Sequence, residues 1–264
     1  MIEYIESFIF KYIGDNPFLI AFFLGSIPML LTSLGSIMGI IGVLKKEGIL
    51  ELGMGFSAGV MITASFTSLI LPGIDLGGIY PVLQGILIGA ITLIFLERLS
   101  PHEHFLKGYE GPQRLRNRLK AIYMLIIAIT IHNLPEGLAV GTAAMYDLTQ
   151  GIIMALAIGI QDIPEGLAIT LPLISIGKDI KRSLGIGILS GVVEPIMALI
   201  PVFLTVYFCI SILPFMMGFA AGAMIYVTSN ELIPESHGTD KEFHASIGFL
   251  IGFILMLYFD TVFG

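Results

Sequence analysis

The chain has 264 residues, of which 56% are hydrophobic and 12% are charged, and its mean hydropathy is +0.94. These values exclude an ordinary soluble domain, because the apolar runs are too long and too many for a soluble core, and they indicate a helical membrane protein that crosses the bilayer several times. The formal net charge of −7 says little about a soluble partner, because most charges must lie in loops, and we expect no nucleic-acid partner. The single cysteine excludes a disulfide framework or a thiolate metal cluster.

The first six residues, Met1 to Glu6, are acidic and contain neither a basic segment nor a small-residue cleavage site. We therefore expect no removable signal peptide and expect the chain to insert through its own helices.

Hydropathy and turn residues divide the remaining sequence into eight predicted spans. They cover residues 18–43, 50–71, 79–97, 121–145, 149–175, 184–208, 213–234 and 244–262. The predicted fold class is an all-α membrane protein with eight transmembrane helices, which forms a single transmembrane domain over residues 1–264. The one sizeable loop, at about residues 98–120, follows the third span.

The basic residues favour one orientation of these spans. When the spans alternate in direction, twelve of the thirteen Lys and Arg residues fall on one side, and only Lys11 falls on the other. The twelve are Lys45, Lys46, Arg98, Lys107, Arg114, Arg116, Arg118, Lys120, Lys178, Lys181, Arg182 and Lys241. Because basic loops stay on the cytoplasmic side, both termini are predicted to lie outside.

A repeat links the second and seventh spans. Residues 55–62 (GFSAGVMI) match residues 218–225 (GFAAGAMI), and the alignment places Ser68 opposite Glu231. Because four spans lie between the copies, they run in opposite directions, which predicts an inverted repeat of spans 1–3 and 6–8 around spans 4 and 5. For three further glycine pairs, helix packing is the favoured reading. These pairs are Gly35/Gly39, Gly85/Gly89 and Gly248/Gly252.

The fourth and fifth spans contain nearly the same polar phrase, HNLPEGLA at residues 132–139 and QDIPEGLA at residues 161–168. On a helix, His132 and Glu136 share one face, and Asn133 lies beside Glu136 on the adjoining face. The fifth span repeats this pattern with Gln161, Asp162 and Glu165. Because the two helices are antiparallel neighbours, they can present a mirrored ring of oxygen and nitrogen ligands.

The sixth span adds Glu194, near mid-depth. With Glu136, Asp162 and Glu165 it makes four carboxylates at the midplane, where no Lys or Arg is near enough in depth to neutralise them. Two divalent cations would balance this charge. One imidazole with several carboxylate and amide oxygens and no thiolate favours Zn²⁺, Fe²⁺ or Mn²⁺ over Ca²⁺ or Mg²⁺.

These residues resemble the ZIP (Zrt-, Irt-like protein) metal transporters, in particular the bacterial GufA-like branch. The resemblance rests on HNLPEG, QDIPEG, Glu194 and the eight spans, and it covers essentially the whole chain. It implies a transporter, not an enzyme, without a prosthetic group, which imports Zn²⁺ and often Cd²⁺, Fe²⁺ or Mn²⁺ across the cell membrane. It also implies a binuclear site. One metal would be held by His132, Glu136, Gln161 and Glu165, and the other by Asn133, Glu136, Asp162, Glu165 and Glu194.

The resemblance also implies a transport pathway, in which Asp75 lines the outer entrance and Glu97, His102, His104 and Glu231 line the inner exit. The repeat adds Ser68 to this set. Two histidines in a polar loop are more often solvated than bound to a metal, so solvation is the favoured reading of His102 and His104 when their residue types alone are considered. The family further implies a homodimer and an elevator-like movement of spans 1, 4, 5 and 6. Many members have His where this chain has Gln161 and Asn where it has Asp162, although the GufA-like branch matches this chain at both positions.

Two other functions fit parts of the pattern. An intramembrane metal-dependent hydrolase would also hold zinc with His and Glu side chains, but the sequence has no HExxH motif and no spare general base. A proton or monovalent-cation pathway fits the negative midplane but leaves His132, Asn133 and Gln161 unexplained.

Overall fold

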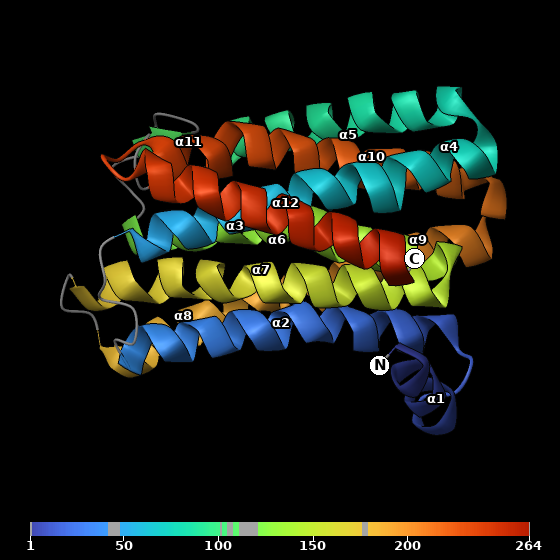
Figure 1. Cartoon of the computed structure of the whole chain (residues 1–264), viewed down its shortest axis with the longest axis horizontal. Helices are drawn as coiled ribbons and strands as arrows, with labels where there is room; N and C mark the ends of the chain where they lie inside the picture. Colours follow the sequence, from blue (N-terminus) through green and yellow to red (C-terminus); the bar gives the residue numbers. More distant parts are fainter. Residues whose placement is uncertain are drawn as a thin grey trace.

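The computed structural model describes residues 2–41, 48–100, 102–104, 108–110, 121–175 and 179–263. These residues form a bundle of long helices that run nearly along one axis (Figure 1). The α-helices are α1 (Ile2–Tyr12), α2 (Pro17–Ile41), α3 (Ile49–Ala64), α4 (Leu71–Gly77), α5 (Ile79–Leu99), α6 (Ala121–Tyr146), α7 (Leu148–Ser175), α8 (Ile180–Gly191), α9 (Val193–Tyr207), α10 (Leu213–Val227), α11 (Ile233–His237) and α12 (Glu242–Phe263).

Seven helical segments of the described chain are long and apolar enough to cross a membrane. They cover Pro17–Ile40, Ile49–Gly77, Ile79–Leu99, Leu148–Leu171, Ile180–Tyr207, Ile210–His237 and Glu242–Phe263, which correspond to seven of the eight predicted spans. The remaining predicted span coincides with α6, a helix of 26 residues. The chain is therefore a multi-pass helical membrane protein, and the count of eight spans stays a prediction.

The two ends of the bundle differ in charge. Both chain termini lie at one end, together with Lys11 of α1 (Figure 1). Arg98 at the end of α5, Lys181 and Arg182 at the start of α8, and Lys241 before α12 all lie at the opposite end. The other eight basic residues of the predicted cytoplasmic side lie outside the described residues, and the orientation of the termini stays a prediction.

Glycines set the closest helix contacts. A Cβ atom on Gly55 or Gly59 of α3 would collide with the backbone carbonyl oxygen of Ala245 or Phe249 of α12. Gly218 and Gly222 of α10 approach the backbone of α5 in the same way, and the glycine pairs at 35/39, 85/89 and 248/252 also lie in close contact with a neighbouring helix. The packing role predicted for those pairs agrees with these contacts.

The contacts also follow the internal repeat. α3 packs along α12 while α10 packs along α5, and α2 packs along α7 while α6 packs along α9. A two-fold axis that exchanged α3 with α10 would place the α3–α12 pair on the α10–α5 pair. If the same axis exchanged α7 with α6, it would place the α2–α7 pair on the α9–α6 pair. These are the pairings that an inverted repeat requires.

Both repeat copies contain a π-helical turn at the same position. η1 (Ser65–Ile70) follows α3, and η4 (Thr228–Leu232) follows α10. In each turn a backbone N–H donates to the carbonyl five residues earlier, from Leu71 to Phe66 and from Ile233 to Thr228. Such turns are rare and occur mostly at functional positions.

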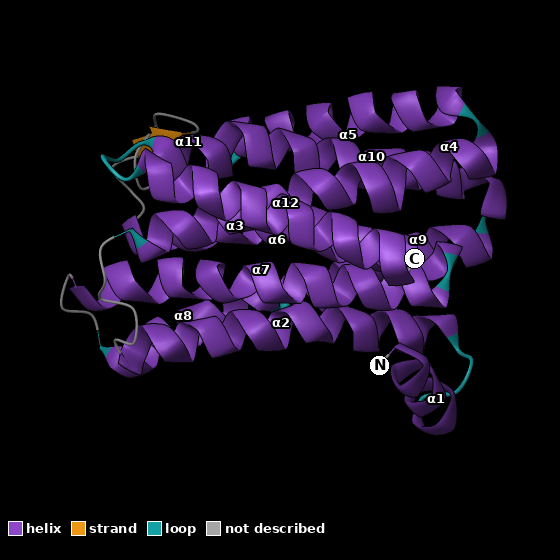
Figure 2. Cartoon of the chain, in the orientation of Figure 1, coloured by secondary structure: helices purple, strands orange, loops and turns teal. Residues whose placement is uncertain are grey.

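Three local features depart from the predicted elements. The sixth span is broken at Val192, so α8 and α9 are separate helices. The predicted all-α class is confirmed, and among the described residues the loop after α5 adds only one short antiparallel pair of strands, β1 (His102–His104) and β2 (Gly108–Glu110) (Figure 2). The third feature is α1, which hydropathy misses because its apolar residues alternate with charged ones.

Because of these contacts, the effect of a Gly→Ala substitution on stability should depend strongly on whether the glycine touches a neighbouring helix. We expect Gly59→Ala to destabilise the protein by about 1–3 kcal/mol, because the added methyl group must displace backbone of α12. The matched control is Gly185→Ala in α8, where nothing lies within 4 Å of the added atom, and where the substitution raises helix propensity. Thermal unfolding in detergent is the measurement. Equal melting temperatures for the two variants would contradict the packing role.

Candidate metal site

The polar phrases of α6 and α7 meet at the centre of the bundle. α6 contributes His132, Asn133 and Glu136, and α7 contributes Asp162 and Glu165. These two helices pack against each other, and both remain helical through Pro135 and Pro164. The shared face predicted for His132 and Glu136 is therefore formed, and it points toward α7.

Two groups of ligand atoms form at this contact. Atoms of His132, Glu136 and Glu165 lie within 4.8 Å of one another, and so do atoms of Glu136, Asp162 and Glu194. Glu136 belongs to both groups. The geometry thus places two candidate ligand triads side by side with one shared carboxylate.

Gln161 and Asn133 complete the set predicted from the sequence. Gln161 Nε2 donates a hydrogen bond of 2.6 Å to Glu136 Oε1. Asn133 Nδ2 donates to Glu194 Oε1 at 3.0 Å. Each amide therefore uses its NH₂ group to hold a carboxylate, which leaves its own carbonyl oxygen free to act as a ligand.

Burial makes the unpaired atoms of this cluster informative. Each of the seven residues has at least one buried nitrogen or oxygen atom without a hydrogen-bond partner. These atoms are His132 Nε2, Asn133 Oδ1, Glu136 Oε2, Gln161 Oε1, both carboxylate oxygens of Asp162, Glu165 Oε1 and Glu194 Oε2. An unsatisfied buried polar atom costs about 1–3 kcal/mol, and more when it is charged. A cation that accepts these lone pairs would remove that cost, so the residues fit a divalent metal ion.

The break at Val192 positions Glu194. Because α9 begins at Val193, Glu194 lies in its first turn, where the helix dipole favours a carboxylate. Two residues before the break, the backbone carbonyl of Ser190 accepts a hydrogen bond of 3.1 Å from Asn133 Nδ2. A broken helix thus supplies both a side chain and a backbone contact at the centre of the bundle.

Glycines bring α6 and α9 close enough for these contacts. A Cβ atom on Gly137 or Gly141 of α6 would collide with the carbonyl oxygen of Glu194 or Ala198 of α9. Asn133 lies one turn before Gly137, so the backbone contact places its amide against the Glu194 carboxylate. The cluster therefore depends on the close packing of these two helices.

Two hydroxyl groups outside the polar phrases touch the cluster. Thr32 Oγ1 of α2 lies 3.4 Å from Glu194 Oε1 as a donor, and Ser57 Oγ of α3 donates to the backbone carbonyl of Gln161 at 2.8 Å. Thr32 is not predicted from the sequence, because an isolated threonine in an apolar span usually donates its hydroxyl hydrogen bond to a backbone carbonyl of its own helix. Thr32 does so as well, since it donates to the carbonyl of Pro28 at 3.0 Å.

On the side of the basic end of the bundle, His132 connects the cluster to Glu231. His132 Nε2 lies 3.9 Å from Glu165 Oε1, while His132 Nδ1 lies 3.2 Å from Glu231 Oε2 in η4. Further along, Glu97 of α5 accepts hydrogen bonds from Tyr226 Oη at 2.6 Å and from Asn230 Nδ2 at 3.2 Å. Two residues of the predicted inner pathway thus lie on one side of the central cluster.

Toward the other end of the bundle, Ser68 meets an acid that the sequence analysis missed. Ser68 Oγ in η1 donates to Asp260 Oδ2 of α12 at 2.7 Å, and Thr67 Oγ1 contacts the same oxygen. Asp260 could have been noticed as a carboxylate near the end of an otherwise apolar span. Asp75 is exposed in α4. The backbone of His102 and His104 forms β1 beside α6, and their predicted metal contacts stay a prediction.

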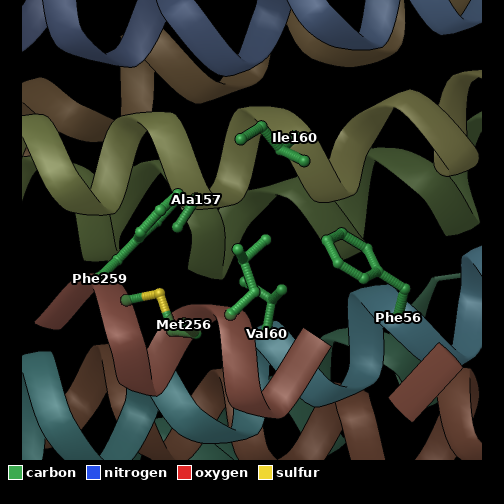
Figure 3. Close-up of a pocket in the computed structure, with 7 residues that line it drawn as sticks. Phe56, Val60, Ala157, Ile160, Met256 and Phe259 are labelled. Atoms are coloured by element: carbon green, nitrogen blue, oxygen red, sulfur yellow. The ribbon is translucent and has the colours of Figure 1, made fainter. Parts of the chain in front are cut away.

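A purely apolar crevice separates α7 from α3 and α12. It is lined by Phe56, Val60, Ala157, Ile160, Leu255, Met256 and Phe259, and Figure 3 shows these side chains meeting from the two sides. Its lining has no charged or hydrogen-bonding side chain, so it does not belong to the cluster. It forms part of the contact between α7 and the α3–α12 pair.

Comparison with known proteins gives a consistent result. Residues 100–260 match the family model described as ZIP Zinc transporter. The chain is 38% identical to zinc transporter ZIPB of Bordetella bronchiseptica, over 80% of this chain and 71% of that protein. It is 41% identical to zinc transporter GufA of Myxococcus xanthus, over 69% and 71%, and 34% identical to zinc transporter ZupT of Corynebacterium glutamicum, over 90% and 97%.

Because Glu136 belongs to both triads, replacing it should weaken Zn²⁺ binding more than replacing a ligand that belongs to one triad. We expect Glu136→Gln to weaken Zn²⁺ binding at both triads by more than the roughly 10–100-fold lost when a group outside the ligand set is removed. Glu194→Gln changes only one triad, so tight binding at the other remains. Calorimetric titration of Zn²⁺ into purified protein measures both stoichiometry and affinity.

The control for this titration is Asp240→Asn, because Asp240 is an acid whose side chain is 86% exposed at the basic end of the bundle. It removes one negative charge without touching the cluster. If Glu136→Gln and Asp240→Asn bound Zn²⁺ equally well, Glu136 would not be a shared ligand.

Proposed function

The chain belongs to the ZIP zinc transporter family, and we propose that it carries Zn²⁺ across the cell membrane toward the cytoplasm through the cluster formed by α6, α7 and α9. The match over residues 100–260 and the relatives at 34–41% identity carry the family assignment. They support divalent metal transport as the activity. The choice of zinc follows the names of those relatives and the donor set of the cluster.

The observation that carries this proposal is the ring of unpaired ligand atoms. Four carboxylates and one imidazole converge where the described structure provides no Lys or Arg partner, and their free atoms all belong to predicted ligands. In a membrane interior such a set is stable only when cations or protons neutralise it. Two divalent ions, bridged by Glu136, would neutralise all four carboxylates.

The donor set also bears on metal choice. One imidazole, carboxylate oxygens and amide oxygens without a thiolate suit borderline ions such as Zn²⁺, and they accept Cd²⁺, Fe²⁺ and Mn²⁺ as well. We therefore propose broad selectivity among these divalent ions, with Gln161 and Asp162 as the positions that tune it.

Movement of one helix group against another would provide alternating access. α2, α6, α7, α8 and α9 pack on one another, while α3 packs on α12 and α5 packs on α10. The contact between the groups includes the apolar crevice between α7 and the α3–α12 pair. Apolar surfaces slide with few directional bonds to break, which supports a movement of the first group that carries the ligands with it.

The polar residues on either side of the cluster suggest a path for the ion. We propose that a hydrated cation enters past Asp75 and the Ser68–Asp260 pair, reaches the ligands, and leaves past Glu231 and Glu97. His132 is suited to the transfer, because its two ring nitrogens face Glu165 on one side and Glu231 on the other. A homodimer, which the family also implies, stays a prediction.

The two rival functions make different demands on the site. A hydrolase needs a general base and room for substrate, whereas every acid of the cluster lies among the candidate ligands. A proton or monovalent-cation pathway needs carboxylates, but it does not explain the imidazole and the two amides that orient them. Metal transport uses all seven residues.

The deciding experiment is Zn²⁺ uptake into liposomes that contain the purified protein and a trapped fluorescent indicator. We expect saturable uptake with the wild-type chain. Uptake should fall to the level of empty liposomes with Glu136→Ala, because that variant removes the carboxylate common to both triads.

Asp240→Asn serves again as the control and should transport like the wild type. A chain that binds Zn²⁺ but does not move it under any pH gradient or voltage would sink the transport proposal. Proton or Na⁺ flux that does not depend on a divalent metal would instead favour the monovalent pathway.

A further inference from the structure

The short helix α1 has three distinct faces. It lies at the end of the bundle where the chain begins, steeply inclined to α2 (Figure 1). Side chains four residues apart share a face on a helix, which sorts the residues of α1 into strips. One strip contains Tyr4, Phe8 and Tyr12, and a second contains Glu3, Ser7 and Lys11. Phe10, which is also exposed, lies apart from the aromatic strip, between Glu3 and Glu6.

The remaining face holds α1 against the protein. Ile2 and Ile9 are buried in the main hydrophobic core. Glu6, on the same face, accepts a hydrogen bond of 2.5 Å from Thr149 Oγ1 in the first turn of α7. The helix is therefore fastened to α7, the helix that carries Gln161 and Asp162.

The aromatic strip, in contrast, has little protein to cover it. Tyr4, Phe8 and Tyr12 are 78%, 41% and 66% exposed. The Phe8 ring packs at a tilt against the Tyr12 ring within the strip and contacts the Phe23 ring of α2 at the edge of the strip, with ring centroids 4.8 and 6.2 Å apart. The strip is thus a continuous aromatic surface that runs onto α2.

The strip continues a surface that faces lipid. α2 is one of the segments apolar enough to cross a membrane, and its first turns expose Leu19 and Phe22 at 53% and 48%. Only four residues, 13–16, separate α1 from α2, so α1 must lie near the level at which α2 leaves the bilayer. Tyr side chains are favoured at that level because an apolar ring and a polar tip suit the headgroup boundary. The Phe8 ring adds apolar area, which strengthens binding to a lipid surface.

The polar strip fits the same placement. Glu3, Ser7 and Lys11 are exposed on the face beside the aromatic strip. The ammonium group of Lys11 lies 5.1 Å from the centroid of the Tyr12 ring, at the border between the two strips. A long basic side chain at such a border can reach the lipid headgroups while its stem stays on apolar surface.

The strip is too small to be a stable protein interface. An aromatic side chain buries roughly 150–250 Å² in all, so the exposed parts of three rings fall well short of the about 800 Å² per partner of a standard interface. A lipid surface sets no such minimum, because binding grows with each apolar group that enters it.

From these observations we propose that α1 is an interfacial anchor. Its strip of Tyr4, Phe8 and Tyr12 binds the boundary between headgroups and acyl chains of the leaflet at the end of the bundle where the chain begins. Through Ile2, Ile9 and Glu6 the anchor then fixes the adjacent end of α7 relative to the membrane surface.

The absence of tryptophan from this chain allows a direct test. Tyr12→Trp places a single fluorophore on the aromatic strip, and Ser7→Trp places one on the polar strip of the same helix. The full-length variants are reconstituted in phosphatidylcholine vesicles with or without bromine on the upper acyl chain. Brominated lipid and aqueous acrylamide then serve as quenchers from the two sides of the boundary.

We expect brominated lipid to quench the indole of the Tyr12→Trp variant strongly and acrylamide to quench it weakly, with the reverse order for the Ser7→Trp variant. The emission of Tyr12→Trp should also be blue-shifted relative to that of Ser7→Trp. Tyr4→Trp repeats the test two helical turns away on the same strip if Tyr12→Trp does not yield folded, monodisperse protein.

Two results would overturn the proposal. Equally strong quenching of the two variants by acrylamide would place the whole helix in water. An indole in the Tyr12→Trp variant that neither quencher reaches would mean that protein, such as a second copy of the chain, covers the strip.

Discussion

The arrangement of this protein follows from the need to keep four carboxylates in an apolar interior. Each of Glu136, Asp162, Glu165 and Glu194 carries a buried oxygen without a hydrogen-bond partner, and the neighbouring amides stabilise only part of the set. Charges held this way favour whatever cation can reach them. The neighbouring helices therefore have to meet two opposed requirements, which are to exclude lipid from the cluster and to leave ligand atoms free for an ion.

Close backbone contact meets the first requirement. Gly137 and Gly141 bring α6 against α9, and Gly35 and Gly166 bring α2 against α7, so that main chains and not bulky side chains surround the ligands. The second requirement is met by amides that donate with nitrogen and keep oxygen free. The same helix contacts thus enclose the site and orient its donors.

The grouping of the candidate ligands could be predicted from the sequence, because helical periodicity decides which residues of HNLPEG and QDIPEG share a face, and length decides their depth. The pairing of Gln161 with Glu136 and the contact of Thr32 with Glu194 could not be predicted, since both depend on how far one helix is rotated against another. The break at Val192 could not be predicted, because the hydropathy of the sequence is continuous from α8 to α9. Helix α1 was not predicted, because the mean hydropathy over its three strips does not distinguish it from a loop. Its pattern of exposed residues can be interpreted only once α1 is known to lie beside α2.

The paired π-helical turns have a consequence for the history of the chain. A π-helical turn has one residue more than the α-helical turn it replaces, so it is what a helix forms when a single residue is inserted. η1 and η4 begin at equivalent residues, Ser65 and Thr228, in two copies that run in opposite directions through the bundle. This equal placement is the pattern expected if both copies descend from one helix that already contained the extra residue. The two turns differ in what they present, since η1 places Ser68 beside Asp260 and η4 places Glu231 beside His132.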